Sequence, residues 1–329
     1  MSTALIVGGT RFIGRHTVTE LLAHDYDVTL LNRGNHENPF ADHDRVEWIE
    51  GDRTERADLE RAAEAVDPDL VVDCVAYHPG EVREATEVFA DAGAYVYVSS
   101  GAVYARPDVP KREGETPLLS CTAEQAQDDS YETYGERKAE GDRAVFEAAE
   151  RGVNAVSVRP TVVYGPHDYT GRLSYWIDRV QRFDRVVVPG DGQHVIHRVY
   201  VEDVASAIRL AGEAGEAGAA YNVGDRRAAT DDWTVELIAD ALDAEVDVVH
   251  ASERELGTAE LSTEDFPLYQ PRPHLLATGR LADLGWTSTE PGAAMEATVA
   301  DHVENERGPS DLGPDRADEE RVIEVLETV

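Results

Sequence analysis

Two residue types that most proteins use freely are scarce in this chain of 329 residues. It has two cysteines, Cys74 and Cys121, and only two lysines, Lys111 and Lys138, so arginine supplies nearly all of its 30 basic side chains. The cysteines have no CxxC spacing and no clustered histidines beside them, which argues against a zinc site and against a disulfide. We expect both to be reduced thiols that fill space, and we expect no metal.

Long apolar runs are also missing. Nowhere do about 18 apolar residues follow one another, and no cationic stretch precedes an apolar segment at Met1, so we expect neither a membrane span nor a signal peptide. The corresponding expectation is a cytoplasmic protein. Hydrophobic residues nevertheless make up 42% of the chain, which is enough for the core of one large α/β unit with a smaller lobe.

Positive charge is scarce as well, because 66 acidic residues face 30 basic ones and the formal net charge is −36. The acids are spread along nearly every expected helix and loop, which is typical of a uniformly solvated surface and not of a specific acidic binding surface. The composition resembles that of proteins from halophilic microbes, since molar salt shortens the Debye length to about 3 Å and screens this self-repulsion. Nucleic acid is not an expected partner, because phosphate contacts need clustered positive charge.

The first 160 residues alternate short apolar, β-branched runs with amphipathic segments. Near-continuous apolar strands separated by helices predict a parallel sheet covered on both faces, which is the doubly wound α/β arrangement of a Rossmann domain. A helix is expected over Tyr131–Arg151, after a long proline-containing loop at Arg106–Ser130 that can cover a site. The expected strands are Ala4–Val7, Asp27–Leu31, Val46–Glu50, Leu70–Val75, Ala94–Val98 and Ala155–Val158.

Beyond Pro160 the alternation loosens, and the second half is expected to form a smaller C-terminal substrate lobe that is interleaved with the main domain. The predicted Rossmann domain spans residues 1–165, with returns near 195–223. The predicted substrate lobe spans residues 166–304. Short strands and one helix are expected in this half, at Val186–Val188, Ala220–Val223 and Thr234–Leu242.

The last segment, residues 305–329, contains glycine and proline at 308, 309, 313 and 314. These residues interrupt any helix before a final amphipathic stretch at Glu319–Leu326. We therefore predict a linker followed by an accessory helix.

A glycine-rich turn, GGTRFIG at residues 8–14, joins the first strand to the first helix. Such a turn presents the N–H groups of the helix N-terminus, with their partial positive charge, to a pyrophosphate. In this interpretation Gly8 makes the turn and Gly14 lets the helix lie close to the sheet; the alternative is an ordinary strand–helix turn. Arg11 stands where the usual GxxGxxG pattern has its middle glycine, and it adds a cation near the adenosine end of a dinucleotide.

Asn32 and Arg33 end the second strand, where an NAD-selective site places Asp or Glu on the ribose 2′-hydroxyl. Arg33 suits a 2′-phosphate better, which favours NADP over NAD. Asn32 can still accept a bond from a ribose hydroxyl, and Arg11 and Arg33 can instead be solvated surface residues. Asp52 and Arg53 follow the third strand, where Asp52 either contacts the adenine amino group or belongs to a plain turn.

Tyr134 and Lys138 lie four residues apart in the expected helix, so they project from the same face. A tyrosine with a pKa near 10 is a poor base at neutral pH, and an adjacent ammonium together with an oxidised nicotinamide lowers that pKa. An incidental pair is the alternative, but a chain that otherwise uses arginine retains a lysine here, where only a compact head fits. Ser100, at the end of the fifth strand, either orients the substrate oxygen or merely forms a turn.

Together these motifs resemble the extended and atypical short-chain dehydrogenases/reductases, which include the NAD-dependent epimerase/dehydratase family of nucleotide-sugar enzymes. The resemblance covers about residues 3–304, and the GGxxxxG turn is most similar to that of the atypical subgroup. It implies that Ser100, Tyr134 and Lys138 form the catalytic triad. Its other marks are VSSGAVY at 98–104, YGERK at 134–138, RPTVVYGP at 159–166, VYVEDV at 199–204, YNVG at 221–224 and LGW at 284–286.

The chain departs from that family beside the expected catalytic serine. The family's 4,6-dehydratases and decarboxylases carry an acidic residue within two positions of the catalytic Ser or Thr, which moves an extra proton. Gly101 and Ala102 follow Ser100 here, so elimination is not the expected reaction.

Further departures concern the substrate. The Asn that often precedes Val-Tyr-Gly-Pro and contacts the sugar is replaced by Val162, and the usual Arg-Asp before the VYVEDV segment is replaced by Ile196 and His197. Both replacements count against the family's usual nucleotide-sugar contacts. His194 or Arg198 can contact substrate instead; the alternatives are a turn histidine and a solvated arginine.

We therefore predict an NAD(P)-dependent oxidoreductase or epimerase that acts on a hydroxyl or carbonyl substrate, with a nucleotide-sugar as one candidate. The alternative is a non-catalytic dinucleotide-binding regulatory or RNA-binding module, as some atypical relatives suggest. The expected partners are a small-molecule substrate and, in a homodimer, a second copy of the chain. Expected cofactor contacts are Gly8, Gly9, Thr10, Arg11, Phe12, Ile13, Gly14, Asn32, Arg33, Asp52, Arg53, Ala76, Tyr134, Lys138 and Pro160; expected substrate contacts are Ser100, Val162, His194 and Arg198.

Overall fold

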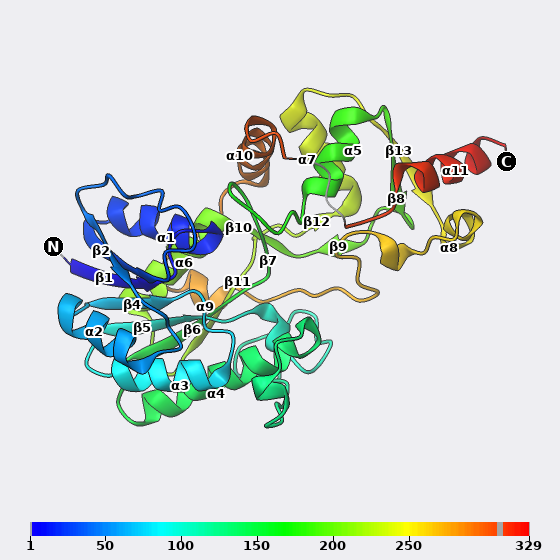
Figure 1. Cartoon of the computed structure of the whole chain (residues 1–329). Helices are drawn as coiled ribbons and strands as arrows, with labels where there is room; N and C mark the ends of the chain where they lie inside the picture. Colours follow the sequence, from blue (N-terminus) through cyan, green and yellow to red (C-terminus); the bar gives the residue numbers. More distant parts are fainter. Residues whose placement is uncertain (1, 308–311, 329) are drawn as a thin grey trace. The chain divides into compact units, whose positions relative to one another are not determined.

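A seven-stranded sheet is formed by six strands from the first 160 residues and one from residues 220–223 in the computed structural model, which describes residues 2–307 and 312–328. All neighbouring strands pair in parallel, in the order β11-β6-β5-β4-β1-β2-β3 (Figure 1). The predicted doubly wound α/β fold is therefore confirmed. The strands are β1 (Ser2–Val7), β2 (Tyr26–Asn32), β3 (Val46–Glu50), β4 (Leu70–Asp73), β5 (Ala94–Val98), β6 (Ala155–Pro160) and β11 (Ala220–Val223).

The strand order reverses between β1 and β4. From β1 the chain moves outward through β2 to β3, then returns to β4 on the other side of β1 and continues to β5 and β6. Ligands of open α/β sheets bind at such a reversal, outside the carboxyl ends of the strands. The topology therefore puts the turn after β1 and the segment after β4 at the expected binding edge.

Helices cover both faces of this sheet (Figure 1). On one face α1 packs against α6, and on the other α3 packs against α2 and α4. The inner strands are buried because both faces are covered; Leu5 and Val7 of β1, for example, lie in a core with Leu59, Val82 and Val145 of α2, α3 and α4. The edge strand β3 is mostly exposed. These helices are α1 (Phe12–Ala23), α2 (Arg56–Val66), α3 (Pro79–Val88), α4 (Tyr134–Glu150), α6 (Val201–Ala214) and the short α9 (Gly279–Ala282), with 3₁₀ turns η1 (Gly101–Val103), η2 (Gln125–Gln127) and η3 (Tyr131–Thr133).

Backbone contacts divide the chain into two units. Unit 1 consists of Met1–Val163, Val201–Gly224 and Leu276–Thr287, and it contains the seven-stranded sheet. Unit 2 consists of Tyr164–Tyr200, Asp225–Leu275 and Ser288–Val329. The interleaving arises because the chain leaves unit 1 after β6 and comes back to it twice.

Unit 2 is built from helices and three short strand pairs. β7 (Val162–Tyr164), which begins at the unit boundary, pairs with β10 (Arg198–Tyr200). The other pairs are β8 (Arg185–Pro189) with β13 (Asp247–Ala251), and β9 (Val195–Ile196) with β12 (Ala229–Thr230). Its helices are α5 (Ser174–Arg182), α7 (Asp231–Leu242), α8 (Glu253–Leu256), α10 (Pro291–Glu304) and α11 (Arg316–Glu327), with 3₁₀ turns η4 (Gly257–Ala259) and η5 (Thr263–Asp265).

Two predicted elements end differently in the structure. The strand expected at Leu70–Val75 stops at Asp73, because the Asp73 carboxylate accepts a hydrogen bond from the Val75 N–H at 3.2 Å and turns the chain out of the sheet. The helix expected over Tyr131–Arg151 begins with the 3₁₀ turn η3, and α4 starts only at Tyr134.

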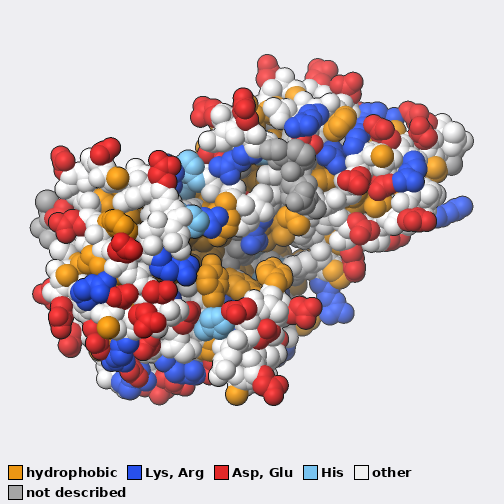
Figure 2. Space-filling model, in the orientation of Figure 1, with side chains coloured by type: hydrophobic (Ala, Val, Ile, Leu, Met, Phe, Trp, Pro, Cys, Tyr) orange, Lys and Arg blue, Asp and Glu red, His pale blue; other side chains and the backbone are white. Residues whose placement is uncertain are grey.

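The outer surface carries the negative charge that the composition requires. Figure 2 shows Asp and Glu side chains scattered over the face in view, with Arg side chains between them. Many acids are paired at the surface, as Arg56 is with Glu60 and Glu87. Among the described residues, no helix is long and apolar enough to cross a bilayer.

The C-terminal helix α11 is attached to unit 2 by a buried carboxylate. Glu319 is fully buried and accepts hydrogen bonds from the Tyr175 hydroxyl at 2.5 Å and from Arg179 Nε at 2.6 Å. Arg316 Nη1 donates to its other oxygen at 3.0 Å. The predicted final helix is thus held by an internal ion-pair network, while the expected helix breakers at 308 and 309 lie outside the described residues.

We expect Glu319→Gln to lower the free energy of unfolding by about 2 kcal/mol, because it removes one of the two carboxylates that pair with the buried Arg179 guanidinium and leaves only Asp178. The matched control is Glu320→Gln on the same helix, whose carboxylate is exposed and should cost less than about 1 kcal/mol. Urea denaturation of the two variants measures the difference. Equal midpoints for Glu319→Gln and Glu320→Gln would show that the network does not anchor α11.

Candidate functional site

The glycine turn between β1 and α1 has the geometry of a phosphate cradle. Gly8 and Gly9 adopt φ values of +111° and +92°, which L side chains rarely adopt. A Cβ on Gly9 would lie 2.5 Å from Leu30 Cδ2, and a Cβ on Gly14 would lie 2.7 Å from the backbone nitrogen of Gly9. Gly14 therefore brings α1 against the glycine turn itself, and not only against the sheet as its sequence position suggested.

The N-terminus of α1 lies next to this turn. Arg11 occupies its N-cap position, and its side chain does not accept a bond from the helix backbone as the preferred Ser, Thr, Asp or Asn would. The positive partial charge of the helix start suits a pyrophosphate. The residues present therefore fit the phosphate end of a dinucleotide.

The residues expected at the adenosine ribose are partly engaged with one another. The Asn32 amide oxygen accepts from the Gly34 N–H at 3.0 Å and from Trp48 Nε1 at 3.2 Å. The Arg33 side chain is 66% exposed, and its Nη1 lies 3.9 Å from an Asp52 carboxylate oxygen. Both residues lie at the end of β2, so Arg33 is accessible to a ligand while Asn32 is held within the protein.

Asp52 and Arg53 differ in their surroundings. Asp52 accepts from the Thr54 N–H and hydroxyl, and these bonds hold the pKa of its carboxyl below the usual value. Arg53 points inward, where it pairs with the fully buried Asp73. Burial opposes its charge, but the carboxylate of Asp73 outweighs this and raises the pKa of Arg53. Nε and Nη1 of Arg53 are buried without a hydrogen-bond partner among the described residues, and its expected cofactor contact stays a prediction.

Lys138 lies at the centre of the site. It projects from α4 and is 2% exposed, and its Nζ donates to the carbonyls of Ala76 and Val98, each at 2.8 Å. Val98 ends β5, and Ala76 follows β4, so one ammonium links the carboxyl ends of two adjacent strands. Burial lowers the pKa of Lys138 to about 8, although nearby carboxylates, chiefly Asp73, oppose the shift.

Three tyrosine rings surround the Lys138 ammonium. Nζ lies 4.8 Å from the ring centroid of Tyr97, 5.1 Å from that of Tyr77 and 5.9 Å from that of Tyr134. Ring faces attract a cation, so they offset part of the cost of burying it. The expected pair of Tyr134 and Lys138 is thus brought together in space as well as in sequence, while the Tyr131 ring stacks on Tyr134 at 6.0 Å.

Ser100 belongs to the turn that follows β5. Its Oγ accepts from the Ala102 N–H at 3.2 Å, so it caps the 3₁₀ turn η1, as the turn-forming alternative foresaw. This turn packs closely against the start of α4. A Cβ on Gly135 would lie only 2.8 Å from the Ala102 carbonyl oxygen, so a glycine is needed at this contact. The fold therefore places the half-buried Ser100 hydroxyl on a turn that adjoins the helix of Tyr134.

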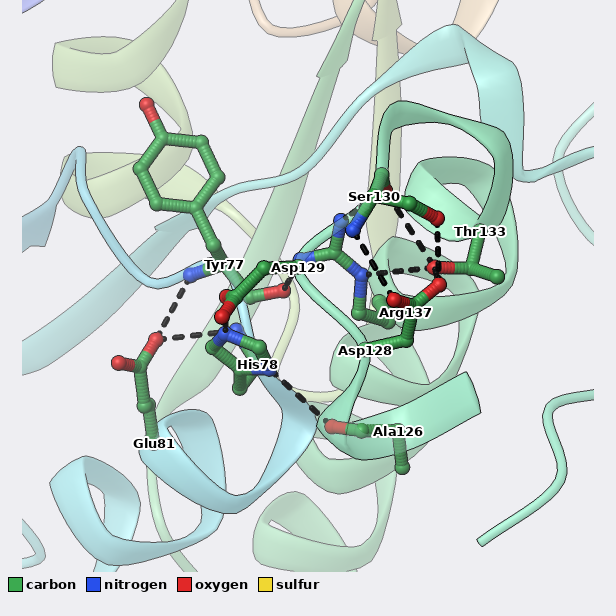
Figure 3. Close-up of polar contacts among 9 residues, drawn as sticks. All are labelled: Tyr77, His78, Glu81, Ala126, Asp128, Asp129, Ser130, Thr133 and Arg137. Carbon is green, nitrogen blue, oxygen red and sulfur yellow. Dashed lines mark hydrogen bonds and ion pairs between the residues drawn. The ribbon is translucent and has the colours of Figure 1, made fainter. Parts of the chain in front are cut away.

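A polar cluster at the start of α4 was not found by sequence reasoning (Figure 3). The buried Arg137 donates to the Ser130 carbonyl at 2.7 Å, to the Thr133 hydroxyl at 3.3 Å and to the Tyr77 carbonyl at 3.3 Å. The Thr133 hydroxyl in turn donates to the Asp128 carboxylate at 2.8 Å. The one local signal was the spacing of Thr133 and Arg137, which puts them on one helical face.

His78 makes a second connection in the same cluster (Figure 3). Its Nδ1 lies 3.2 Å from the Ala126 carbonyl and its Nε2 lies 2.9 Å from Asp129. Glu81 accepts from the backbone N–H groups of Tyr77 and His78 and completes the cap of α3. The loop that precedes Tyr134 is thus attached to the start of α3 at two places.

The remaining predicted residues are distributed over both units. In unit 1, Pro160 ends β6 and is buried, and Val162 is half-buried. In unit 2, His194 pairs with Asp231 at 3.1 Å. Arg198 is 4% exposed and donates to the Thr234 hydroxyl at 3.0 Å, so it is not the solvated arginine of the alternative interpretation. Among the described residues, no group of three or more His, Cys, Asp or Glu is arranged to hold a metal.

Comparisons with known proteins agree with this geometry. The chain is similar to the chloroplast stem-loop binding protein of 41 kDa b of Arabidopsis thaliana, with 26% identity over 264 residues. The match covers 76% of this chain and 66%, just under two thirds, of that relative's own length.

Two solved structures show the same fold. A dTDP-glucose 4,6-dehydratase of Bacillus anthracis in complex with NAD has a TM-score of 0.73 at 19% identity, and the match covers 93% of this chain and 98% of that one. A UDP-N-acetylglucosamine 4-epimerase of Methanobrevibacter ruminantium has a TM-score of 0.72 at 21% identity, with 92% and 99% covered. Residues 4–224, which contain the glycine turn and the Tyr134–Lys138 pair, match the NAD dependent epimerase/dehydratase family. This chain is therefore a member of the NAD-dependent epimerase/dehydratase family.

Proposed function

We propose that this protein is an NAD(P)-dependent epimerase or oxidoreductase in which Tyr134, Lys138 and Ser100 act on a hydroxyl or carbonyl group. The observation that carries the proposal is the buried ammonium of Lys138, which lies beside the Tyr134 ring and joins the ends of β4 and β5. The glycine turn at Gly8 and Gly9 lies at the same edge of the sheet, on the neighbouring strand.

Each of the three side chains has a distinct task. Tyr134 accepts the proton of the substrate hydroxyl and returns it in the reverse step. Lys138 holds positive charge near the phenol, which favours the phenolate, and its Nζ can also hold a ribose hydroxyl. Ser100 hydrogen-bonds the reacting oxygen and fixes its direction of approach. The nicotinamide, when bound, supplies the acceptor for the hydride that leaves the substrate carbon.

Epimerisation or oxidoreduction fits this site better than elimination. Loss of water needs a further proton-transferring group near the reacting carbon, and Gly101 and Ala102 beside Ser100 have none. Nucleotide-sugars are the first candidate substrates, since similar structures include a UDP-sugar epimerase and a dTDP-sugar dehydratase. The substrate contact that we propose in unit 1 is that of Ser100; the expected contacts of Val162, His194 and Arg198 stay predictions.

A second candidate function has one specific observation in its favour, which is the similarity to a stem-loop binding protein. In that case the dinucleotide site would serve regulation or stem-loop binding without catalysis. The net charge of −36 opposes nucleic-acid binding, because phosphates need clustered cations. A gel-shift titration with a stem-loop RNA, in low and in molar KCl, distinguishes the two functions: retention of RNA at low micromolar protein concentration would favour the second.

The Tyr134→Phe variant tests the proposed chemistry. Loss of the phenol proton acceptor should lower turnover about 10²- to 10⁴-fold and change cofactor affinity little, because the ring remains. Turnover is followed by proton NMR of the anomeric signals of UDP-glucose, UDP-N-acetylglucosamine and dTDP-glucose in molar KCl with NAD or NADP. Tyr131→Phe, which removes a neighbouring hydroxyl, is the control. If Tyr134→Phe keeps turnover within about threefold of the parent, the proposed role of this residue is wrong.

The Arg33→Ala variant tests the cofactor preference. We propose that NADPH binds more tightly than NADH, because the exposed Arg33 guanidinium can pair with a 2′-phosphate, worth about 1 kcal/mol and therefore about fivefold in affinity. Arg33→Ala should abolish this margin, and Asp52→Asn should widen it by removing the carboxylate that competes for Arg33. Fluorescence titrations with both reduced cofactors measure the dissociation constants. Equal affinities in the parent protein would refute the preference.

The stability of the protein should depend on pH through Lys138. The unfolded chain keeps this proton up to the ordinary pKa of 10.5, whereas the folded chain releases it near pH 8, so the unfolded state binds more protons between these values. The contribution of Lys138 to stability therefore rises with pH in that interval. We expect the unfolding free energy of the parent, minus that of Lys138→Met, to rise by about 2 kcal/mol from pH 7.5 to 9.5. A difference that stays constant in urea melts would contradict this burial effect.

A further inference from the structure

Arg137 connects the two segments that flank the Tyr134–Lys138 pair. On one side it donates to the Tyr77 carbonyl, and Tyr77 directly follows Ala76, whose carbonyl holds Lys138. On the other side it donates to Ser130 and Thr133, which belong to the turn that leads into Tyr134. Figure 3 shows the guanidinium lying between these two segments. Arg137 thus contacts both the segment at Tyr77 and the turn that precedes Tyr134.

The chemistry of the contacts suits arginine alone. The three acceptors are two main-chain carbonyls and one hydroxyl, and they lie in different directions around the planar guanidinium, whose five N–H groups form a rigid fork. An ammonium in the same place cannot reach all three. Arg137 is connected to a carboxylate through the Thr133 hydroxyl, which accepts from Arg137 and donates to Asp128.

Burial makes these bonds consequential. Arg137 is 4% exposed and its three hydrogen bonds are part-buried, so removing the guanidinium releases the turn from the Tyr77 carbonyl and lets it move. The turn residues Tyr131–Thr133 form η3, which continues directly into α4 at Tyr134. A shift of the turn is therefore transmitted to the Tyr134 ring, while Lys138 stays fixed by the ends of β4 and β5.

We propose that Arg137 is a positioning residue, which sets the place of the Tyr134 phenol relative to the Lys138 ammonium by holding the turn at Ser130–Thr133 to the Tyr77 carbonyl. The inference rests on the proposed role of Tyr134 as proton acceptor. The connection made by His78 lies farther along the loop, at Ala126 and Asp129, and acts on Tyr134 less directly.

The test compares Arg137→Met and Arg137→Lys with a matched control on the same helix, Arg143→Met. Arg143 also donates to a loop carbonyl, that of Leu119, but it does not touch the turn before Tyr134. Tyrosine labelled with ¹³C at Cζ reports the titration of each phenol by NMR, and the Tyr134 signal is assigned by its loss in Tyr134→Phe. The dissociation constant of NADH and the turnover number on the substrate found above are measured in parallel.

We expect Arg137→Met to move the titration midpoint of Tyr134 upward by about half a pH unit or more, because the phenolate lies farther from the ammonium. Turnover should fall about tenfold or more, while the NADH dissociation constant stays within about threefold. Arg137→Lys should recover part of both effects, since one acceptor can be reached. Arg143→Met should leave the titration and the turnover as in the parent.

Two results would overturn the proposal. One is an Arg137→Met variant whose Tyr134 titration and turnover match those of Arg143→Met, with only thermal stability reduced. The second result applies if Arg137→Met does not fold. Thr133→Val then replaces it, because this variant removes one acceptor of Arg137 and keeps the side-chain shape. An unchanged Tyr134 titration in Thr133→Val would overturn the proposal. Should the parent show no turnover on any sugar nucleotide, the proposed function fails, yet the NMR titration still decides whether Arg137 positions Tyr134.

Discussion

The burial of one lysine ammonium is the constraint on which the site depends. Lys138 loses almost all contact with water, and the fold compensates with two carbonyl oxygens and three aromatic faces. Those carbonyls lie at the ends of β4 and β5, so the ammonium can be satisfied only when the parallel sheet is correctly assembled. The position of Lys138 in the site therefore depends on the correct pairing of β4 and β5. Arg137 connects the turn before Tyr134 to the same region through the Tyr77 carbonyl.

Exposed and buried charges differ in their role in this protein. The surface is strongly acidic, whereas the interior contains cations that each have specific partners: Arg53 pairs with Asp73, Arg179 with Glu319 and Asp178, and Lys138 with two carbonyls. Breaking a buried pair exposes an uncompensated charge to a medium that solvates it poorly, whereas a surface pair is worth little. The internal cations consequently anchor particular elements, while the exposed acids set only the overall electrostatic field.

The sequence predicted elements better than it predicted partners. β5 and β11 begin and end at the predicted residues, since a buried strand is largely apolar along its length. β3 also has its predicted bounds, although it is a mostly exposed edge strand with two glutamates. The ion pair of Arg53 with Asp73 was not predicted, and Arg198 is buried although the sequence was compatible with a solvated side chain. Nothing in the local pattern distinguishes these arginines from the exposed Arg33, because burial depends on elements far away in the sequence.

The sequence by itself determined the parallel α/β fold, the glycine turn after β1 and the common face of Tyr134 and Lys138, because each follows from local periodicity or from backbone conformations open only to glycine. The tertiary structure alone decided which carbonyls hold Lys138, that the Ser100 turn packs on the start of α4, and that Arg137 links Tyr77 to the turn before Tyr134. These contacts join residues tens of positions apart. They exist only because the strand order places the ends of β4 and β5 side by side next to α4.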